Sequence, residues 1–105
     1  MMHHDDVAAS LAELGNSHRL AIFRLLVKAG FPGATVGEIQ QSLEIPASTL
    51  SHHLARMAKV GLILQEKQSR TIYCKPDFAH LNQVIQFLQN ECCQGFNEEE
   101  KTPGE

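Results

Sequence analysis

Two short amphipathic segments separated by a tight turn constrain what this chain can fold into more than any other feature. Residues Val36 to Leu43 and Ser48 to Val60 carry apolar side chains at helical spacing. Thr35 and Glu38 have the Thr-x-x-Glu spacing of a capping box, and Ser48 is a residue type that commonly caps helices. Glu44 to Ala47 form a turn between the segments. The pattern therefore predicts two helices joined by a short turn.

A hairpin is expected directly after this helix pair. Leu62 to Lys67 alternate in character, Thr71 to Tyr73 are β-forming residues, and Gln68 and Ser69 are expected to form the tip between them. Ile45 is expected to fill the turn between the helices. The residues expected to pack the two helices together are Ile39, Leu43, Leu50, Leu54 and Met57. Two helices on a short turn, followed by a hairpin, are the outline of a winged helix.

Three further helices are expected around this unit. Apolar spacing and breaking residues place them at Val7 to Leu14, Ser17 to Lys28 and Phe78 to Asn90. The predicted order is α-α-α-α-β-β-α, so the fold class is mainly α, a winged helix-turn-helix. Residues 1–93 are expected to form one domain for DNA binding and dimerisation, and residues 94–105 an acidic, disordered tail.

The first and last predicted helices carry more apolar surface than a monomer of 105 residues is expected to cover. The residues concerned are Val7, Leu11, Leu14, Phe78, Leu81, Ile85 and Leu88. A chain of this size builds only a modest core, and an exposed apolar face of this kind marks an interface. We therefore expect a two-fold homodimer through these two helices.

Charge is unevenly distributed along the chain. The net charge is −3, yet the stretch from Ser48 to Pro76 holds five basic residues against the single acid Glu66. A local basic surface is the electrostatic mark of nucleic-acid binding. Double-stranded DNA is expected to meet Ser48, Thr49, Ser51, His52 and His53 on the second helix of the pair, with Arg56, Lys67 and Arg70 mainly at phosphates.

The composition does not indicate a secreted, membrane-spanning or catalytic protein. The polar N-terminus lacks a signal-peptide stretch and no segment is long enough to span a bilayer, so we expect a cytoplasmic protein with no membrane partner. Three cysteines, an odd number, suit a reducing compartment. The sequence shows no glycine-rich phosphate loop, nucleophile elbow or paired carboxylates, so the chain is not expected to be an enzyme.

Four stretches together resemble the ArsR/SmtB family of metal- and metalloid-responsive repressors. They are residues 16–26 (NSHRLAIFRLL), 35–39 (TVGEI), 46–54 (PASTLSHHL) and 58–63 (AKVGLI). The resemblance extends over about residues 7–93, and the combination is specific where any one stretch is weak. It implies a homodimer that binds operator DNA and is released from it by an inducer.

The resemblance also bears on the inducer site. The family's arsenic site on the first helix of the pair is absent, because residues 36–40 hold no cysteine, and its zinc-type pattern stops after Asp77 and His80. Cys92 and Cys93 resemble the subgroup with an arsenical site at a C-terminal cysteine pair. This resemblance implies a trivalent arsenic inducer, arsenite or methylarsenite, and thiolates suit such a thiophilic species. Residues 94–105 hold no third cysteine, which favours methylarsenite unless Cys74 or a partner subunit contributes.

The cysteine pair is open to other interpretations. Cysteines at a helix end are commonly small, half-buried apolar residues. Cys92 and Cys93 are also compatible with a repressor of the same fold that senses thiol oxidation, although adjacent cysteines form a strained ring as a disulfide. A third hypothesis keeps the winged helix but uses it for protein contacts only. Cys74 is expected to pack within the sheet.

Overall fold

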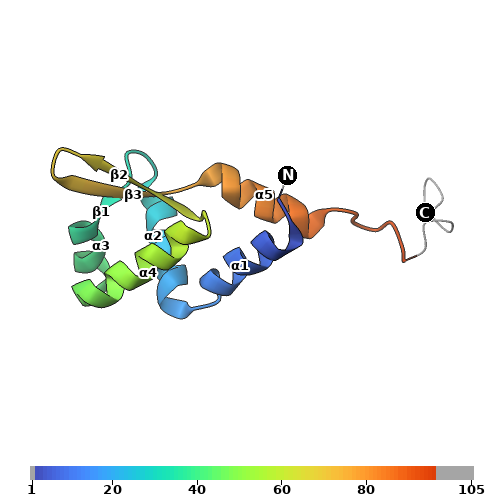
Figure 1. The fold of residues 1–105 in the computed structure, drawn as a ribbon, viewed down its shortest axis with the longest axis horizontal. Helices are drawn as coiled ribbons and strands as arrows, with labels where there is room; N and C mark the ends of the chain where they lie inside the picture. The colour runs from blue at the N-terminus through green and yellow to red at the C-terminus, as the bar shows by residue number, and fades with distance from the viewer. Residues whose placement is uncertain (1, 97–105) are drawn as a thin grey trace.

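The computed structural model describes residues 2–96 of the chain, in which five helices and three strands form a winged helix-turn-helix (Figure 1). The helices are α1 (His4–Leu14), α2 (Ser17–Ala29), α3 (Val36–Leu43), α4 (Ala47–Lys59) and α5 (Phe78–Gln89). The strands are β1 (Ala34–Thr35), β2 (Ile63–Gln68) and β3 (Thr71–Pro76). The predicted fold class is confirmed, and the predicted order lacked only β1. Most of the expected acidic tail, residues 97–105, lies outside the described residues.

Local side-chain contacts begin most of the helices where the sequence predicts. Thr35 and Glu38 form the predicted capping box, with the Thr35 hydroxyl accepting from the Glu38 amide at 3.1 Å. The Asn16 side chain accepts from the Arg19 amide and starts α2. The predicted cap at Ser48 is wrong: α4 begins at Ala47 after Pro46, whose fixed φ suits the entry to a helix. Ser48 therefore lies within the first turn of α4.

The sheet has the order β1-β3-β2 and is antiparallel throughout. Ala34 pairs with Cys74 at the β1 edge, a pairing too short to give a sequence pattern of its own. Gly33 has φ +99°, and a Cβ there would lie 2.5 Å from the Cys74 carbonyl oxygen, so this approach requires glycine. The hairpin tip is Ser69 and Arg70, one residue later than predicted, and Ser69 takes the left-handed conformation.

The core lies between the helix pair, α2 and the sheet. The predicted packing of α3 on α4 is confirmed, with Leu43 partly buried and the other members buried. Ile45 is 7% exposed and fills the turn as expected. The buried apolar residues of this core are Ile22, Phe23, Leu26, Ala34, Ile39, Ile45, Leu50, Leu54, Met57, Leu62, Ile63 and Cys74. The fold thus holds α4 firmly by its apolar side and leaves its polar side outward.

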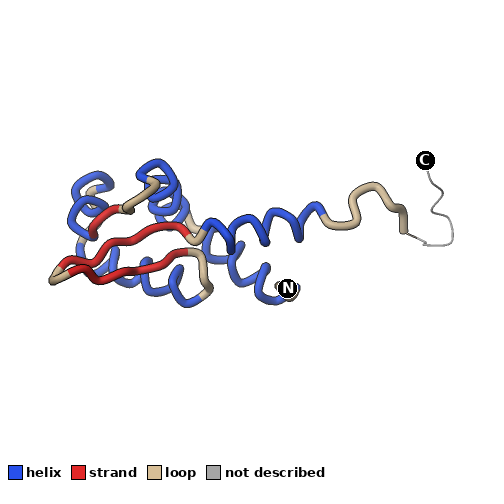
Figure 2. The backbone as a smooth tube through the Cα atoms, turned by 90° about the horizontal axis from the view of Figure 1, so that it is seen from above, coloured by secondary structure: helices blue, strands red, loops and turns tan. Residues whose placement is uncertain are grey.

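Helices α1 and α5 lie beside one another at the end of the molecule away from the wing tip (Figures 1 and 2). Val7 and Val84 are buried at 2% exposure. Several other apolar residues of the same helices stay exposed: Leu11 at 40%, Phe78 at 36%, Ile85 at 44% and Leu88 at 59%. The two helices therefore present an apolar surface that the described chain does not cover. None of the described helices is long and apolar enough to cross a membrane.

Candidate nucleic-acid interface

The exposed side of α4 carries short polar side chains and one imidazole. Ser48, Thr49, Ser51 and His52 are all exposed, as predicted for residues that approach base edges. They occupy the first two turns of the helix, and the α3–α4 packing fixes the direction in which this side faces. Hydroxyls and an imidazole at a helix N-terminal half have the reach and the donors to contact bases and phosphates in a major groove.

The prediction that the His53 side chain is exposed is wrong. His53 is 7% exposed, and its Nδ1 lies 3.3 Å from Nη1 of Arg19 on α2. Burial, with a further contribution from the positive Arg19, lowers the pKa of His53 below its ordinary value. The residue belongs to the packed side of α4 together with Leu50, Leu54 and Met57. The spacing 50, 53, 54 and 57 is itself an apolar helical face, which is the signal that places His53 inside.

Arg56 has an intramolecular partner that local sequence patterns do not indicate. Its guanidinium contacts the Glu13 carboxylate of α1 at 2.8 Å from Nε and 3.2 Å from Nη2. Arg19 also lies 3.1 Å from this carboxylate. The hydrogen bond from Arg56 is the main cause that lowers the pKa of Glu13. The Arg56 side chain is 48% exposed, and its charge is paired with Glu13 in the described chain.

The wing carries cations at its tip. Lys67 lies near the end of β2 and Arg70 in the turn, and both are exposed. Neither forms an ion pair within the part of the chain that the structure describes. Lys75, by contrast, contacts Glu66 at 2.6 Å across the hairpin and lies over the Phe31 ring. The free positive charge of the hairpin is therefore concentrated at its tip, where a DNA backbone is within reach.

The cysteine pair lies beyond the last helix, not at its end. Helix α5 stops at Gln89, and Cys92 and Cys93 follow in an exposed turn in which Cys93 has φ +64°. Their sulfur atoms are 2.9 Å apart and both thiols are free. This contact, with a smaller contribution from burial, raises the pKa of the Cys92 thiol. Within the described chain both side chains are exposed, so this chain alone does not pack Cys92 and Cys93 as half-buried apolar residues.

Cys74 is separate from that pair. It is fully buried in β3 as predicted, and burial raises the pKa of its thiol. The 12 residues of α5 intervene, a helix about 18 Å long at 1.5 Å per residue. Cys74 of the same chain is therefore not placed to join Cys92 and Cys93. In the described residues no three His, Cys, Asp or Glu side chains gather as a metal site.

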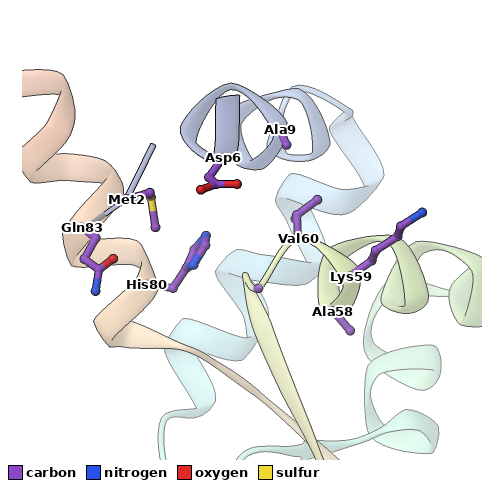
Figure 3. Close-up of a pocket in the computed structure, with 9 residues that line it drawn as sticks. Met2, Asp6, Ala9, Ala58, Lys59, Val60, His80 and Gln83 are labelled. Atoms are coloured by element: carbon purple, nitrogen blue, oxygen red, sulfur yellow. The ribbon is translucent and has the colours of Figure 1, made fainter. Parts of the chain in front are cut away.

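The two residues that begin the zinc-type pattern serve structural roles. Asp77 caps α5 by accepting from the His80 amide at 3.1 Å. His80 Nε2 lies 2.7 Å from the hydroxyl of the buried Ser10 on α1. The imidazole also borders an open cavity of about 530 Å³ between α1, the end of α4 and α5 (Figure 3). Asp77 thus starts α5, and His80 ties α5 to α1.

A helix pair packed by its apolar side, with an exposed polar face on α4 and a cationic wing, defines a DNA-binding winged helix-turn-helix protein. Residues 14–66 match a helix-turn-helix domain family. The chain is 33% identical over 89 residues to the HTH-type transcriptional regulator YgaV of Escherichia coli, covering 85% of this chain and 88% of YgaV. It belongs to the ArsR-type family of helix-turn-helix transcriptional regulators.

Solved structures of other proteins share this architecture. The transcriptional activator HlyU of Vibrio cholerae is 30% identical over 84 residues, which are 80% of this chain and 75% of HlyU. A structure of HlyU superposes with a TM-score of 0.68 over 89% of this chain and all of that one. A second HlyU structure, described as reduced, superposes with a TM-score of 0.66 over 86% of this chain and 92% of that one. The homodimeric DNA-binding domain of Mb0332 from Mycobacterium bovis is 26% identical to this chain. It superposes with a TM-score of 0.65 over 83% of this chain and 81% of that one.

Proposed function

We propose that this DNA-binding regulator is a homodimeric repressor that leaves its operator when a trivalent arsenical binds Cys92 and Cys93. The observation that carries the inducer part is the pair of free, exposed sulfur atoms 2.9 Å apart. The operator part is supported by the exposed polar side of α4 and by the family. Methylarsenite is the preferred inducer, because two thiols satisfy it and no third described thiol of the chain lies near them.

In the proposed complex, the N-terminal half of α4 enters a major groove. Ser48, Thr49, Ser51 and His52 approach the base edges, and Lys67 and Arg70 of the wing contact phosphates. His53 and Arg56 are left out of this set, since each has a partner inside the chain. This division makes α4 responsible for sequence preference and the wing for salt-dependent affinity.

Two copies are proposed to associate through α1 and α5. The uncovered apolar residues Leu11, Phe78, Ile85 and Leu88 supply the contact, and the homodimeric Mb0332 domain shows that this fold supports a pair. A two-fold dimer would set its two α4 helices about one DNA turn, roughly 34 Å, apart. The matching operator is an imperfect palindrome.

The inducer step is a condensation. Each thiol of Cys92 and Cys93 displaces one hydroxyl group of methylarsenite, so two As–S bonds replace two As–O bonds and two waters leave. No electrons are transferred, and thiols that are protonated before the reaction lose their protons into these waters. The product is a small ring in which one arsenic atom joins adjacent residues. Such a ring constrains the turn that follows α5 and, through α5, the proposed dimer contact.

Release must be allosteric in this scheme. The cysteine pair follows α5, which lies with α1 rather than on the exposed side of α4 (Figure 1). A ligand at such a distance releases DNA only by binding the DNA-free state more tightly, and typical coupling energies are about 1–3 kcal/mol. That range corresponds to roughly 5- to 150-fold weaker operator binding when the inducer is saturating.

The test is a titration of the protein–DNA complex with methylarsenite, arsenite, antimonite and zinc in parallel. Cys92→Ser and Cys93→Ser are expected to bind the operator normally and to resist release. Cys74→Ser is the matched control and should respond like the parent. A reporter gene behind the same operator, silent without arsenical and active with it, tests repression against activation. Parent-like release of both pair variants would exclude the pair as the inducer site.

A second candidate is control by thiol oxidation. It is favoured by the short distance between the two exposed sulfurs and by the structure of the relative HlyU that is described as reduced. Peroxide would take two protons and two electrons from the thiols of Cys92 and Cys93, which leaves a disulfide and two waters. Mass spectrometry separates the candidates, because oxidation only removes two hydrogens from the chain, whereas methylarsenite replaces these two hydrogens with an arsenic atom and a methyl group.

A further inference from the structure

A buried carboxylate at the end of α1 joins three helices. The Glu13 side chain is 12% exposed and accepts two hydrogen bonds from Arg56 of α4. Arg19 of α2 lies 3.1 Å from the same carboxylate and donates to the Glu13 backbone carbonyl at 2.8 Å. Two guanidinium groups from different helices thus converge on one acid, which belongs neither to the exposed side of α4 nor to the wing.

An acidic residue at position 13 is unfavourable for the stability of α1 by itself. Helix α1 ends at Leu14, so Glu13 lies in its last turn, where the negative end of the helix dipole repels a carboxylate. The acid is compensated there by Arg56 and Arg19. Its placement therefore favours the contact with α4 and α2 over the stability of α1 itself.

The same network holds α4 at a second point. Arg19 reaches His53 with Nη1 to Nδ1 at 3.3 Å, and His53 lies three residues before Arg56 on α4. Arg19 and Glu13 together therefore contact α4 at two places about one helical turn apart. The contacted residues neighbour Ser51 and His52 of the exposed side. A change in the Glu13 contacts would rotate or shift the side chains proposed to meet the bases.

We propose that Glu13 is a positioning residue for sequence-specific DNA recognition, which fixes α4 against α1 and withholds the Arg56 guanidinium from non-specific phosphate contact. The inference rests on the proposed operator binding by α4. Glu13 then has two effects on DNA binding that can be measured separately. Losing the carboxylate frees α4 to shift, which weakens selective binding, and frees a cation, which strengthens non-selective binding.

The test compares Glu13→Gln with the parent on two duplexes across a range of salt concentrations. One duplex is selected by the parent from a random library, and the other is a scrambled duplex of the same length. The variant is expected to lose at least about tenfold in affinity for the selected duplex. Its affinity for the scrambled duplex should hold or rise, with a salt dependence steeper by up to about 0.9 units per freed Arg56.

Two further variants complete the design. Asp5→Asn removes one exposed carboxylate from the first turn of α1 and should match the parent on both duplexes. The double variant Glu13→Gln/Arg56→Gln removes the freed cation, so the salt dependence should return to the parent value while selectivity stays low. Should Glu13→Gln not fold by circular dichroism, Arg56→Gln breaks the same contact and should lose selectivity with no steeper salt dependence.

The outcomes are distinct. Equal loss on both duplexes with unchanged salt dependence shows a purely structural role for Glu13 and overturns the inference. An unchanged ratio of the two affinities in a folded Glu13→Gln variant overturns it as well. Failure of the parent to enrich any duplex from the library overturns the proposed operator binding instead, and is seen before any variant is made.

Discussion

Arg70 offers the most direct test of the wing as a DNA contact. It is exposed in the turn of the hairpin and makes no ion pair among the described residues. Its replacement by alanine therefore breaks no ion pair within the described chain. If the wing contacts phosphate, Arg70→Ala should weaken binding to every duplex, because phosphate contacts carry no sequence information.

The expected magnitude follows from counterion release. Each phosphate contact contributes about 0.9 units to the slope of log affinity against log salt. A dimer has two wings, so Arg70→Ala should reduce the slope by about 1.8 units. Between 50 and 200 mM salt, a fourfold change, the parent should then lose about 12-fold more affinity than the variant.

Fluorescence anisotropy with a labelled duplex at several salt concentrations measures the slope. Arg24→Ala is the matched control, since it removes the same group from the exposed side of α2, which the proposed complex leaves without a DNA contact. Identical slopes for the parent and Arg70→Ala would refute the assignment of the wing tip to phosphate contact. An equal reduction of the slope by Arg24→Ala would show that the effect of Arg70→Ala is not specific to the wing.

Three further predictions concern the scaffold. Ile39→Ala should lower the free energy of unfolding by about 2–5 kcal/mol in urea titrations, because Ile39 is fully buried between α3 and its neighbours. The lowered pKa of His53 means that its stabilising contribution is complete above its ordinary value of 6.5 and is lost as pH falls; melting temperatures of His53→Gln should therefore depend less on pH than those of the parent. Leu88→Glu should sediment as a monomer with unchanged circular dichroism, since Leu88 is 59% exposed within one chain and proposed to be covered in the dimer; a dimer that persists would move the interface elsewhere.

Sequence reasoning succeeds here where structure is decided locally. The bounds of α3 follow from the capping box of Thr35 and Glu38, two residues that satisfy one another. The wing follows from alternation and β-forming residues, and its tip is displaced by one residue because Ser69 adopts the left-handed conformation without a glycine signal. Ser48 is a good capping residue by type, but Pro46 starts α4 earlier. Residue type sets a preference, and the neighbouring backbone decides between adjacent positions.

Features made by distant residues were not predictable in the same way. Glu13 and Arg56 are 43 positions apart, and no local pattern pairs them. Strand β1 has two residues and exists only because β3 is there to pair with it. His53 is the intermediate case: its side chain is polar by type, but its spacing from Leu50 and Met57 places it on the packed side of α4. Spacing was the better guide than polarity at that position.

Strand β1 also bears on how this protein can be engineered. Thr35 is both the last residue of β1 and the cap of α3, and it pairs with Tyr73 of the wing. No residue separates β1, which pairs with the wing strand β3, from the start of α3. Gly33 permits the close approach of the chain to Cys74 of β3. A wing transplanted from a relative as the β2–β3 hairpin alone would bring a foreign neighbour to Ala34 and Thr35. The natural exchange unit therefore runs from Gly33 to Pro76, so wing and helix pair should be transplanted together.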